Sequence, residues 1–403
     1  MNYKRNTTPR SVLETPISRR ISAVLTTLTC FLVLAALPSL AETSVRPEQA
    51  GGIYDKPYLL GKGERVSVGG YLDMEFEWEQ DGGNTFDQHR FIPFITGQVS
   101  ERVTVSAEIE FEHGGHVKDG GGDGEIKLEY AVMDFSIREA LNFRGGVVLS
   151  PLGSFNLLHD SPLNDLTARP VVSRQLVPTT LSEAGMGLFG SGAAGEEWVL
   201  SYEAYLVNGF NDGIITGDPG EEKLRVRSGR GSQKSDNNKD KAIVARLGMS
   251  PRLGTNFGLS VHSGKYDDDD QHRLTIGALD AKFTMGPLEL QGEAALVNAD
   301  IDHELYPTVA ESQHGAYAQL NYHVLHDALM NGSVVTLVAR GDWVDYDTDR
   351  DGDTEDGFTL GANFRPTEET VFKLDYNWSR TTPVAGERGD TKGRFFFSFA
   401  TYF

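Results

Sequence analysis

Charged side chains recur at alternate positions in several parts of the sequence, and this spacing places them on one face of an extended strand. The first set is acidic apart from one arginine: Glu75, Glu77, Glu108, Glu110 and Arg90. The second set is basic and comes from well-separated segments: Arg144, Arg246 and Arg340. Rows of carboxylates concentrate cations, whereas grouped arginines concentrate anions. Both sets of residues could therefore attract ions, the acidic set cations and the basic set anions.

A further group of ligand-type residues lies in Asp347–Asp356, whose sequence is DTDRDGDTED. Its aspartates alternate along the chain: Asp347, Asp349, Asp351 and Asp353. Gly352 follows the third of them, as at the start of an EF-hand calcium loop, but Phe358 stands where the closing glutamate of such a loop belongs. Two interpretations stay open: a Ca²⁺ site, or a solvated acidic loop that collects divalent ions. The run Asp267–Asp270 has the same two interpretations.

Catalytic residue types form no recognisable arrangement in the sequence. The pair His262–Ser263 could suggest a hydrolase, but adjacent residues of a strand point to opposite faces. The formal net charge of −21 disfavours nucleic acid as a partner, because nucleic-acid phosphates repel an acidic protein. We therefore expect no enzymatic activity, and no cofactor other than Ca²⁺ at the acidic loops.

The segments that carry the charged residues alternate apolar and polar side chains over roughly ten residues each. In Val66–Trp78, for example, Leu72, Met74 and Phe76 share one face, and Asp73 lies on the other. This pattern predicts strands with one apolar and one polar face. A soluble β-sandwich would show the same alternation and is the alternative fold.

The connections between these segments mostly alternate between short and long. Short turns at one end and long loops at the other are typical of outer-membrane barrels, whose closed sheet satisfies every backbone hydrogen bond inside lipid. We therefore predict an all-β fold, a transmembrane antiparallel β-barrel of about 16 strands over residues 66–403. The predicted strands are residues 66–78, 89–100, 102–113, 125–136, 141–150, 183–190, 196–208, 240–250, 255–266, 271–285, 288–299, 312–324, 333–346, 357–364, 370–380 and 393–403.

The N-terminal residues 1–41 have the features of a secretory signal peptide. The apolar run Ile21–Leu37 follows Arg19 and Arg20, and small residues precede a cleavage point after Ala41. A membrane anchor is the alternative interpretation. Cleavage would remove the only cysteine, Cys30, so the exported chain would form no disulfide. Residues 42–65 would then form a short periplasmic segment before the barrel.

The predicted third external loop, residues 151–182, is less polar than a surface loop should be. Phe155, Leu157 and Val172 are among its apolar residues, and apolar side chains are stabilised by removal from water. We therefore predict that this loop folds into the barrel and constricts it. Its charged residues would border the narrowest point: Asp160, Asp165, Arg169 and Arg174. The alternative is that these four pair with one another or with the wall.

The chain ends in GRFFFSFATYF, in which Phe395, Phe397 and Phe399 alternate with other residues up to the terminal Phe403. We predict a closing strand whose phenylalanine face contacts lipid. Alternating apolar residues that end in phenylalanine resemble the C-terminal signal read by the outer-membrane barrel assembly machinery, so Phe403 is the predicted assembly signal. The alternative is a soluble protein whose C-terminus is merely apolar.

Three features together resemble a bacterial porin of the phosphate-selective porin O/P superfamily: GGYLDMEFEWE at residues 69–79, FRGGVVLSPLGSFNLLHDSPLNDLTARP at residues 143–170, and Phe403. The resemblance implies a sixteen-stranded, usually trimeric barrel with the third loop folded inside. The family's phosphate-specific members line the pore with an arginine ladder and a lysine cluster. Arg144, Arg246 and Arg340 would form a sparse ladder, but residues 151–182 contain no lysine, a departure that counts against phosphate selectivity.

The combined interpretation is a homotrimeric porin of a Gram-negative outer membrane, with passive diffusion of ions and small hydrophilic solutes as its function. Its expected partners are membrane lipid, lipopolysaccharide bridged by divalent ions at the acidic loops, and the barrel assembly machinery. Two alternatives stay open. One is an anion- or phosphate-selective channel, and the other is a surface-exposed barrel that binds calcium or a ligand.

Overall fold

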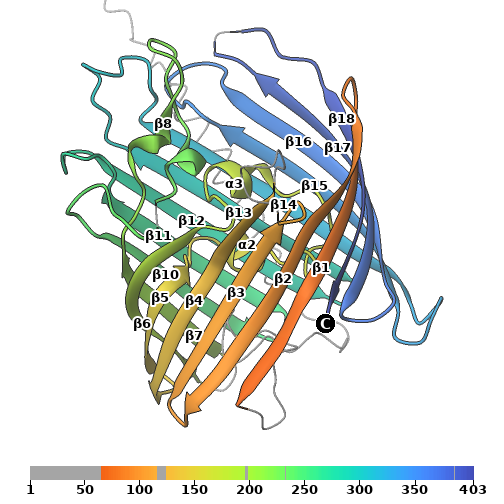
Figure 1. Cartoon of the computed structure of the whole chain (residues 1–403). Coiled ribbons are helices and arrows are strands. Elements are labelled where there is room, and N and C mark those ends of the chain that lie inside the picture. Colours follow the sequence, from red (N-terminus) through yellow and green to blue (C-terminus); the bar gives the residue numbers. More distant parts are fainter. Residues whose placement is uncertain (1–64, 116–123, 196–197, 232, 385) are drawn as a thin grey trace, which may run out of the picture. The chain divides into compact units, whose positions relative to one another are not determined.

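The computed structural model describes residues 65–115, 124–195, 198–231, 233–384 and 386–403. Within these residues, sixteen antiparallel strands form a closed barrel in which the first strand pairs with the last (Figure 1). The strands are β1 (Val66–Glu79), β2 (Asn84–Ser100), β3 (Val103–Glu112), β4 (Glu125–Arg138), β5 (Leu141–Leu149), β6 (Ser182–Ala194), β7 (Trp198–Val207), β10 (Ala242–Arg252), β11 (Thr255–Lys265), β12 (Arg273–Met285), β13 (Leu288–Ala299), β14 (Ser312–His326), β15 (Val334–Asp345), β16 (Thr354–Arg365), β17 (Thr370–Thr382) and β18 (Lys392–Tyr402).

Smaller elements lie in the connections of the described chain. Two short helices, α2 (Ser154–Leu157) and α3 (Val171–Gln175), belong to the β5–β6 connection. The β7–β10 connection carries a small hairpin of β8 (Ile215–Thr216) and β9 (Lys223–Leu224) and two 3₁₀ turns, η1 (Asp212–Ile214) and η2 (Val226–Gly229). No described helix is long and apolar enough to cross a membrane. The predicted signal peptide, and residues 42–64 of the predicted periplasmic segment, lie outside the described residues.

The predicted all-β antiparallel barrel is confirmed, and most strand bounds agree closely with the prediction. Two predicted connections are wrong. The expected long loop at residues 79–88 is a tight turn at residues 80–83, because Asn84–Asp87 continue the sheet by pairing with Glu75–Trp78. The expected turn at residues 191–195 is mostly strand, because Ser191–Ala194 pair with Trp198–Ser201 of β7. Glycine and polar residues suggested that the strand ended at both places. Backbone pairing with the adjacent strand extends it instead.

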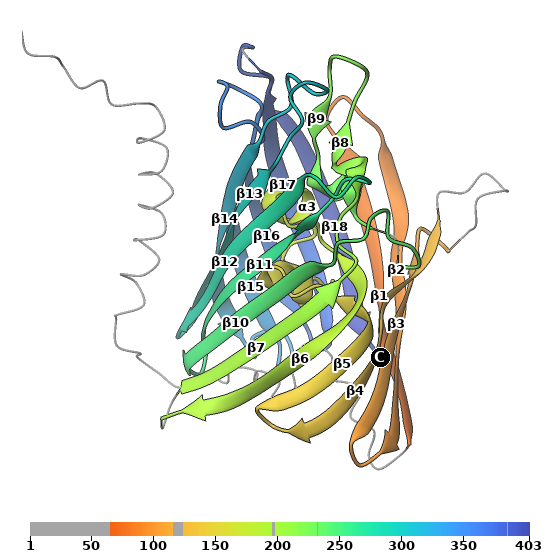
Figure 2. The same ribbon diagram turned by 90° about the vertical axis from the view of Figure 1, so that its left-hand side faces the viewer.

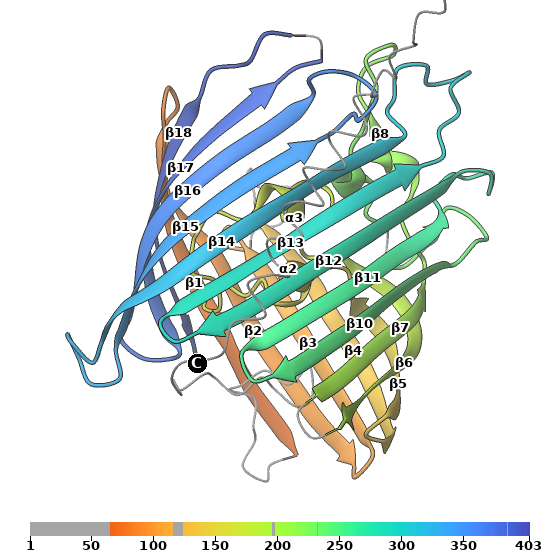
Figure 3. The ribbon, with the colours of Figure 1, turned by 180° about the vertical axis from the view of Figure 1, so that it is seen from behind.

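The two faces of the strands differ sharply in exposure. On β17 the side chains of Phe372, Leu374 and Trp378 are 40%, 50% and 38% exposed, whereas the intervening Lys373 and Asp375 are almost fully buried. Figure 3 shows the strands of the wall from behind. The same alternation of exposure runs along the strands, so the outer surface is a band of apolar residues. Further members of this band are Val105, Met133, Leu188, Leu206, Leu247, Leu259, Leu296, Leu320, Leu337, Leu360 and Phe397.

The barrel closes where the terminal residue meets β1. The Phe403 amide donates to the Gly70 carbonyl at 2.9 Å, and the Gly70 amide donates to the Phe403 carbonyl at 3.1 Å. The Phe403 ring stacks on Phe91, with 5.7 Å between the ring centroids. A Cβ atom on Gly70 would lie 2.4 Å from the Ile92 carbonyl oxygen and 2.7 Å from the Phe403 ring, so only glycine fits this seam. Phe403 is 53% exposed on the outer face, as predicted for the closing strand.

The β5–β6 connection, residues 150–181, lies within the barrel, where α2 and α3 appear behind the strands of the wall (Figure 2). Its apolar residues, including Leu157, Val172 and Leu176, are buried in a cluster with inward-facing residues of several strands. We call this connection the inner loop. We call the end of the barrel that carries the β8–β9 hairpin the long-loop end, and the opposite end the short-turn end.

Candidate functional site

Three inward-facing carboxylates of the wall hold the backbone of the inner loop. Glu293 on β13 accepts hydrogen bonds from the Ser154 and Phe155 amides at 2.7 and 3.1 Å. Asp342 on β15 accepts one from the Val171 amide at 3.0 Å. Asp375 on β17 accepts one from each of the Thr167 and Ala168 amides at 3.1 Å. Because these acceptors belong to β13, β15 and β17, the contacts fix the loop against strands far from its own ends.

Asp160 and Asp165, predicted to border the constriction, also fasten the loop to the wall. The Tyr402 hydroxyl donates to Asp160 at 2.8 Å, and Asp160 is fully buried. Asp165 pairs with Arg365 of β16 at 3.0 Å and accepts hydrogen bonds from Asn321 and from Asn363. Burial alone would raise the pKa of Asp165, but the Arg365 guanidinium outweighs it and lowers this pKa below its ordinary value.

The two predicted loop arginines differ in their partners. Arg174 pairs with Glu355 of β16 at 3.1 Å. Arg169 makes no ion pair or hydrogen bond with any described residue, and its Nη2 atom is buried without an acceptor. Both side chains border the same cavity. Arg169 therefore presents its positive charge to the cavity without a neutralising carboxylate.

That cavity, about 260 Å³ in volume, lies between the inner loop and the wall. We call it the central cavity. Six basic side chains line it, two from the loop and four from strands β2, β15, β17 and β18: Arg90, Arg169, Arg174, Arg340, Lys373 and Arg394. Three carboxylates also line it: Glu75, Glu77 and Asp165. The central cavity is therefore richer in basic than in acidic groups, although the whole chain is acidic.

The three arginines predicted as a ladder are each paired with a wall carboxylate. Arg144 bonds both oxygens of Asp134 at 2.7 and 2.6 Å, and Arg246 bonds both oxygens of Asp280 at 2.6 and 2.8 Å. Arg340 bonds Asp342 at 2.9 Å and donates to the Ala168 carbonyl of the inner loop. Of the three, Arg340 lines the central cavity. The charges of these three arginines are therefore largely neutralised by wall carboxylates. The sequence pattern did not predict these pairs.

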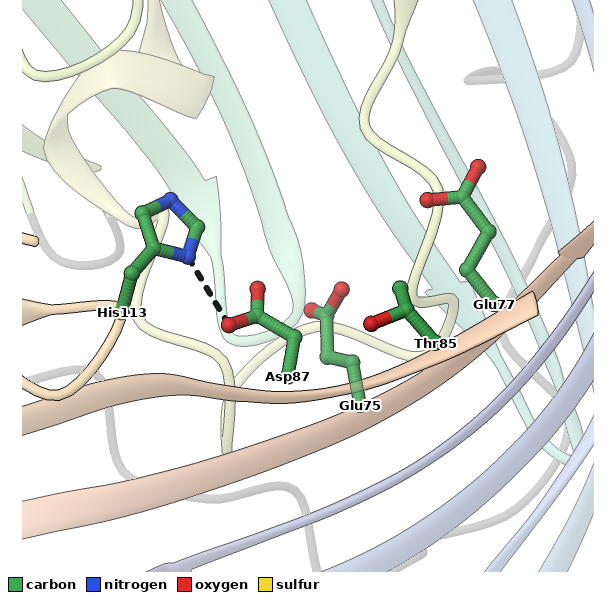
Figure 4. A pocket seen from close by; sticks show the side chains of 5 residues that line it. All are labelled: Glu75, Glu77, Thr85, Asp87 and His113. Carbon is green, nitrogen blue, oxygen red and sulfur yellow. Dashed lines mark hydrogen bonds and ion pairs between the residues drawn. The ribbon is translucent and has the colours of Figure 1, made fainter. Parts of the chain in front are cut away.

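The predicted acidic wall divides into a buried and an accessible part. Glu108 and Glu110 are fully buried, and Arg90 bridges Glu110 and Glu112 at 2.8 and 2.6 Å. Glu75 and Glu77 instead line a second cavity of about 440 Å³, which we call the mouth cavity (Figure 4). Glu75 and Glu77 therefore present acidic groups to this cavity, although Glu77 lies 3.7 Å from Arg394.

The aspartates of the predicted calcium loop do not converge. Asp347 is buried and bonded to Arg350, while Asp353 lies 3.7 Å from Arg225. Asp349 and Asp351 are exposed. In the part of the chain that the structure describes, histidine and carboxylate ligand atoms converge within 4.8 Å at another place, on β1, β2 and the end of β3.

His262 and Ser263 point to opposite faces, as the strand pattern predicts. The His262 ring is buried in the interior, with its Nε2 atom 2.9 Å from Glu183. The Ser263 hydroxyl lies 2.9 Å from the Thr275 hydroxyl on the other face. The two side chains therefore do not form a nucleophile and base pair.

Comparison with known proteins gives one sequence relative and several structures of the same fold. No family model matches the sequence. The chain is 26% identical over 356 residues to an uncharacterized protein of Aquifex aeolicus (strain VF5), covering 81% of this chain and 78% of that one. Membership of the phosphate-selective porin superfamily stays a prediction.

Solved structures share the barrel at low sequence identity. An anion-selective porin from Comamonas acidovorans matches with a TM-score of 0.54 and 11% identity, over 84% of this chain and 99% of that one. The outer membrane protein OmpT of Vibrio cholerae, in a trimer form, matches with a TM-score of 0.51 and 11% identity, again over 84% and 99%. These similarities place the chain with the closed sixteen-stranded antiparallel barrels of outer-membrane porins in fold.

Proposed function

We propose that this protein is an outer-membrane porin that lets ions and small hydrophilic solutes diffuse passively across the membrane. The observation that carries the proposal is the combination of a closed barrel, an apolar exterior and a charged interior with cavities beside an inner loop. Closure leaves no unpaired strand edge, which a sheet in lipid requires. A barrel of about sixteen strands is wide enough to hold an aqueous channel.

We propose a general or weakly selective channel as the primary function and anion preference as the second candidate. The second candidate rests on the excess of basic over acidic side chains in the central cavity and on the unpaired Arg169. The similarity in fold to a porin described as anion-selective agrees with it. The carboxylates of the mouth cavity oppose it, so any preference for anions should be weak.

The proposal includes a homotrimer in the outer membrane of a Gram-negative bacterium. The apolar exterior supports a membrane location, and the trimer form of a similarly folded protein agrees with the oligomeric state. Contact with lipopolysaccharide and recognition of Phe403 by the assembly machinery are parts of the same proposal. Chemical cross-linking of the purified protein in mild detergent should yield a species of three chains.

Swelling of liposomes that contain the purified full-length protein tests the proposed diffusion. Sugars of increasing size should enter at decreasing rates, because the inner loop narrows the barrel. Protein-free liposomes are the control. Swelling no faster than in the control would contradict the proposal and favour the alternative of a surface barrel that binds calcium or another ligand.

A further inference from the structure

Four side chains that could ligate a metal ion meet at the long-loop end of the barrel interior. They come from three consecutive strands: Glu75 on β1, Asp87 and His89 on β2, and His113 just after β3. Ligand atoms of Asp87, His89 and His113 lie within 4.8 Å of one another, and so do those of Glu75, His89 and the neighbouring Asp73. Two overlapping sets therefore share His89.

An irregularity in β2 brings part of this group together. Asp73 pairs with Arg90, whereas Glu75 pairs with Asp87, so Gln88 and His89 together stand opposite the single residue between Asp73 and Glu75. Such a β-bulge redirects side chains and is common beside functional sites. Asp87 and Arg90 are three positions apart, so in a regular strand they would face opposite sides. The bulge lets both side chains face the interior.

The backbone beyond β3 positions the second imidazole. His113 has φ of 50°, a left-handed conformation that few residues other than glycine adopt, and its amide donates to the His89 carbonyl at 3.3 Å. Its Nδ1 atom lies 2.8 Å from one oxygen of Asp87, and the Nδ1 atom of His89 lies 3.0 Å from the other. The ring centroids of the two histidines are 5.5 Å apart, on either side of one carboxylate (Figure 4 shows Asp87 and His113).

We propose that Asp87, His89 and His113 form a binding site for a divalent transition-metal ion such as Zn²⁺ or Cu²⁺. Imidazole nitrogen is a preferred ligand of these ions and a poor ligand of Ca²⁺ and Mg²⁺, which take oxygen. Two imidazole nitrogens and one carboxylate supply three protein ligands, as in zinc sites whose fourth position is taken by water.

The site is open to ions in solution. Asp87, Glu75 and His113 line the mouth cavity, and the side chains of His89 and His113 are 21% and 41% exposed. Glu75 lies beside the other nitrogen of the same ring, with 3.9 Å between its carboxylate and the His89 Nε2 atom, and adds a negative charge next to the site. An ion could therefore bind from the lumen without movement of the strands.

Titration of the detergent-folded full-length protein, freed of metal with a chelator, tests this site independently of channel activity. Isothermal calorimetry should show one Zn²⁺ ion bound per chain, and His89→Gln or His113→Gln should each weaken Zn²⁺ binding about tenfold or more. Electron paramagnetic resonance with Cu²⁺ should show hyperfine coupling to two nitrogens in the native protein and to one in each variant. Ca²⁺ should not compete.

The chain provides a matched control. His303 lies 2.8 Å from Glu311 in a connection at the same end of the barrel, so His303→Gln removes one imidazole from a single histidine–carboxylate pair. That variant should bind Zn²⁺ as the native protein does. If a histidine variant fails to fold by circular dichroism, Asp87→Asn supplies the same test. Native Zn²⁺ affinity in these site variants, a comparable loss in His303→Gln, or no binding to the native chain would overturn the proposal.

Discussion

At the scale of single residues, Arg169 differs from the other charged groups of the interior. Arg144, Arg246 and Arg340 are each bonded to a carboxylate, so their charges are compensated within the wall. Arg169 has no such partner among the described residues and borders the central cavity. Its charge should therefore act on a permeating ion more directly than the predicted ladder does.

Replacing Arg169 by glutamine should shift the channel toward cations. A unit charge about 5 Å from an ion contributes about 0.8 kcal/mol in water, so the ratio of anion to cation permeability should fall roughly two- to fourfold. Reversal potentials in a KCl gradient measure this ratio. Arg138→Gln, at an exposed position near the short-turn end, is the matched control and should leave the ratio unchanged. An unchanged ratio in Arg169→Gln would exclude Arg169 as a determinant of selectivity.

His159 of the inner loop should make the stability of the protein depend on pH. Burial favours the neutral ring, but the Glu129 carboxylate, 2.6 Å away, outweighs burial and raises the pKa of His159 above its ordinary value. A raised pKa in the folded state stabilises the protein fully below the unfolded pKa of about 6.5, and this stabilisation is lost as the pH rises through the folded value.

The thermal midpoint of the native protein should therefore exceed that of His159→Gln most at pH 6 or below, and the difference should shrink as the pH rises. Circular dichroism melts of both proteins across this range measure the difference. A difference that stays constant with pH would show that the His159 contact contributes through packing alone.

The candidate site could be predicted only in part at this scale. The inward direction of Glu75, Arg144, Arg246 and Arg340 follows from strand alternation, which is a local property of the sequence. Their partners do not, because pairing depends on which strands are adjacent and on their register. The approach of His113 to Asp87 was missed for the same reason, since it depends on a bulge in β2 and on the pairing of Arg90 with Glu112.

At the scale of elements, the strands could be predicted well and the connections less well. Sixteen alternating segments predict sixteen strands because one face of each must meet a different solvent from the other. The turn at residues 80–83 and the extension of β6 to Ala194 were missed, because glycine and polar residues within a paired strand look like a break. The β8–β9 hairpin was also missed, since two-residue strands carry no periodic signal.

The inner loop is the element that should control the width of the channel. Asp375 accepts two of its backbone hydrogen bonds, and bonds to charged groups contribute about 1.5–3 kcal/mol each. Asp375→Ala should loosen the middle of the loop and give larger and noisier single-channel currents. Asp134→Ala is the matched control, because it removes an inward carboxylate that binds Arg144 and not the loop. Equal currents in the two variants would contradict the expectation that this loop controls the width of the channel.

At the scale of the whole molecule, an acidic chain encloses a central cavity lined by more basic than acidic groups. Carboxylates of the described interior lie at the mouth cavity, in ion pairs of the wall and in contacts with the inner loop. The net charge of the chain therefore does not describe the balance of charged groups at the central cavity. This distribution is compatible with passage of both cations and anions.

Single-channel recording of the purified protein in a planar lipid bilayer tests whether this barrel conducts ions. We expect stepwise currents whose conductance rises with salt concentration, as for a water-filled pore, and a reversal potential in a KCl gradient that indicates weak selectivity. Absence of current steps, with the barrel shown to be folded and inserted in the membrane, would contradict the claim that this barrel is a channel.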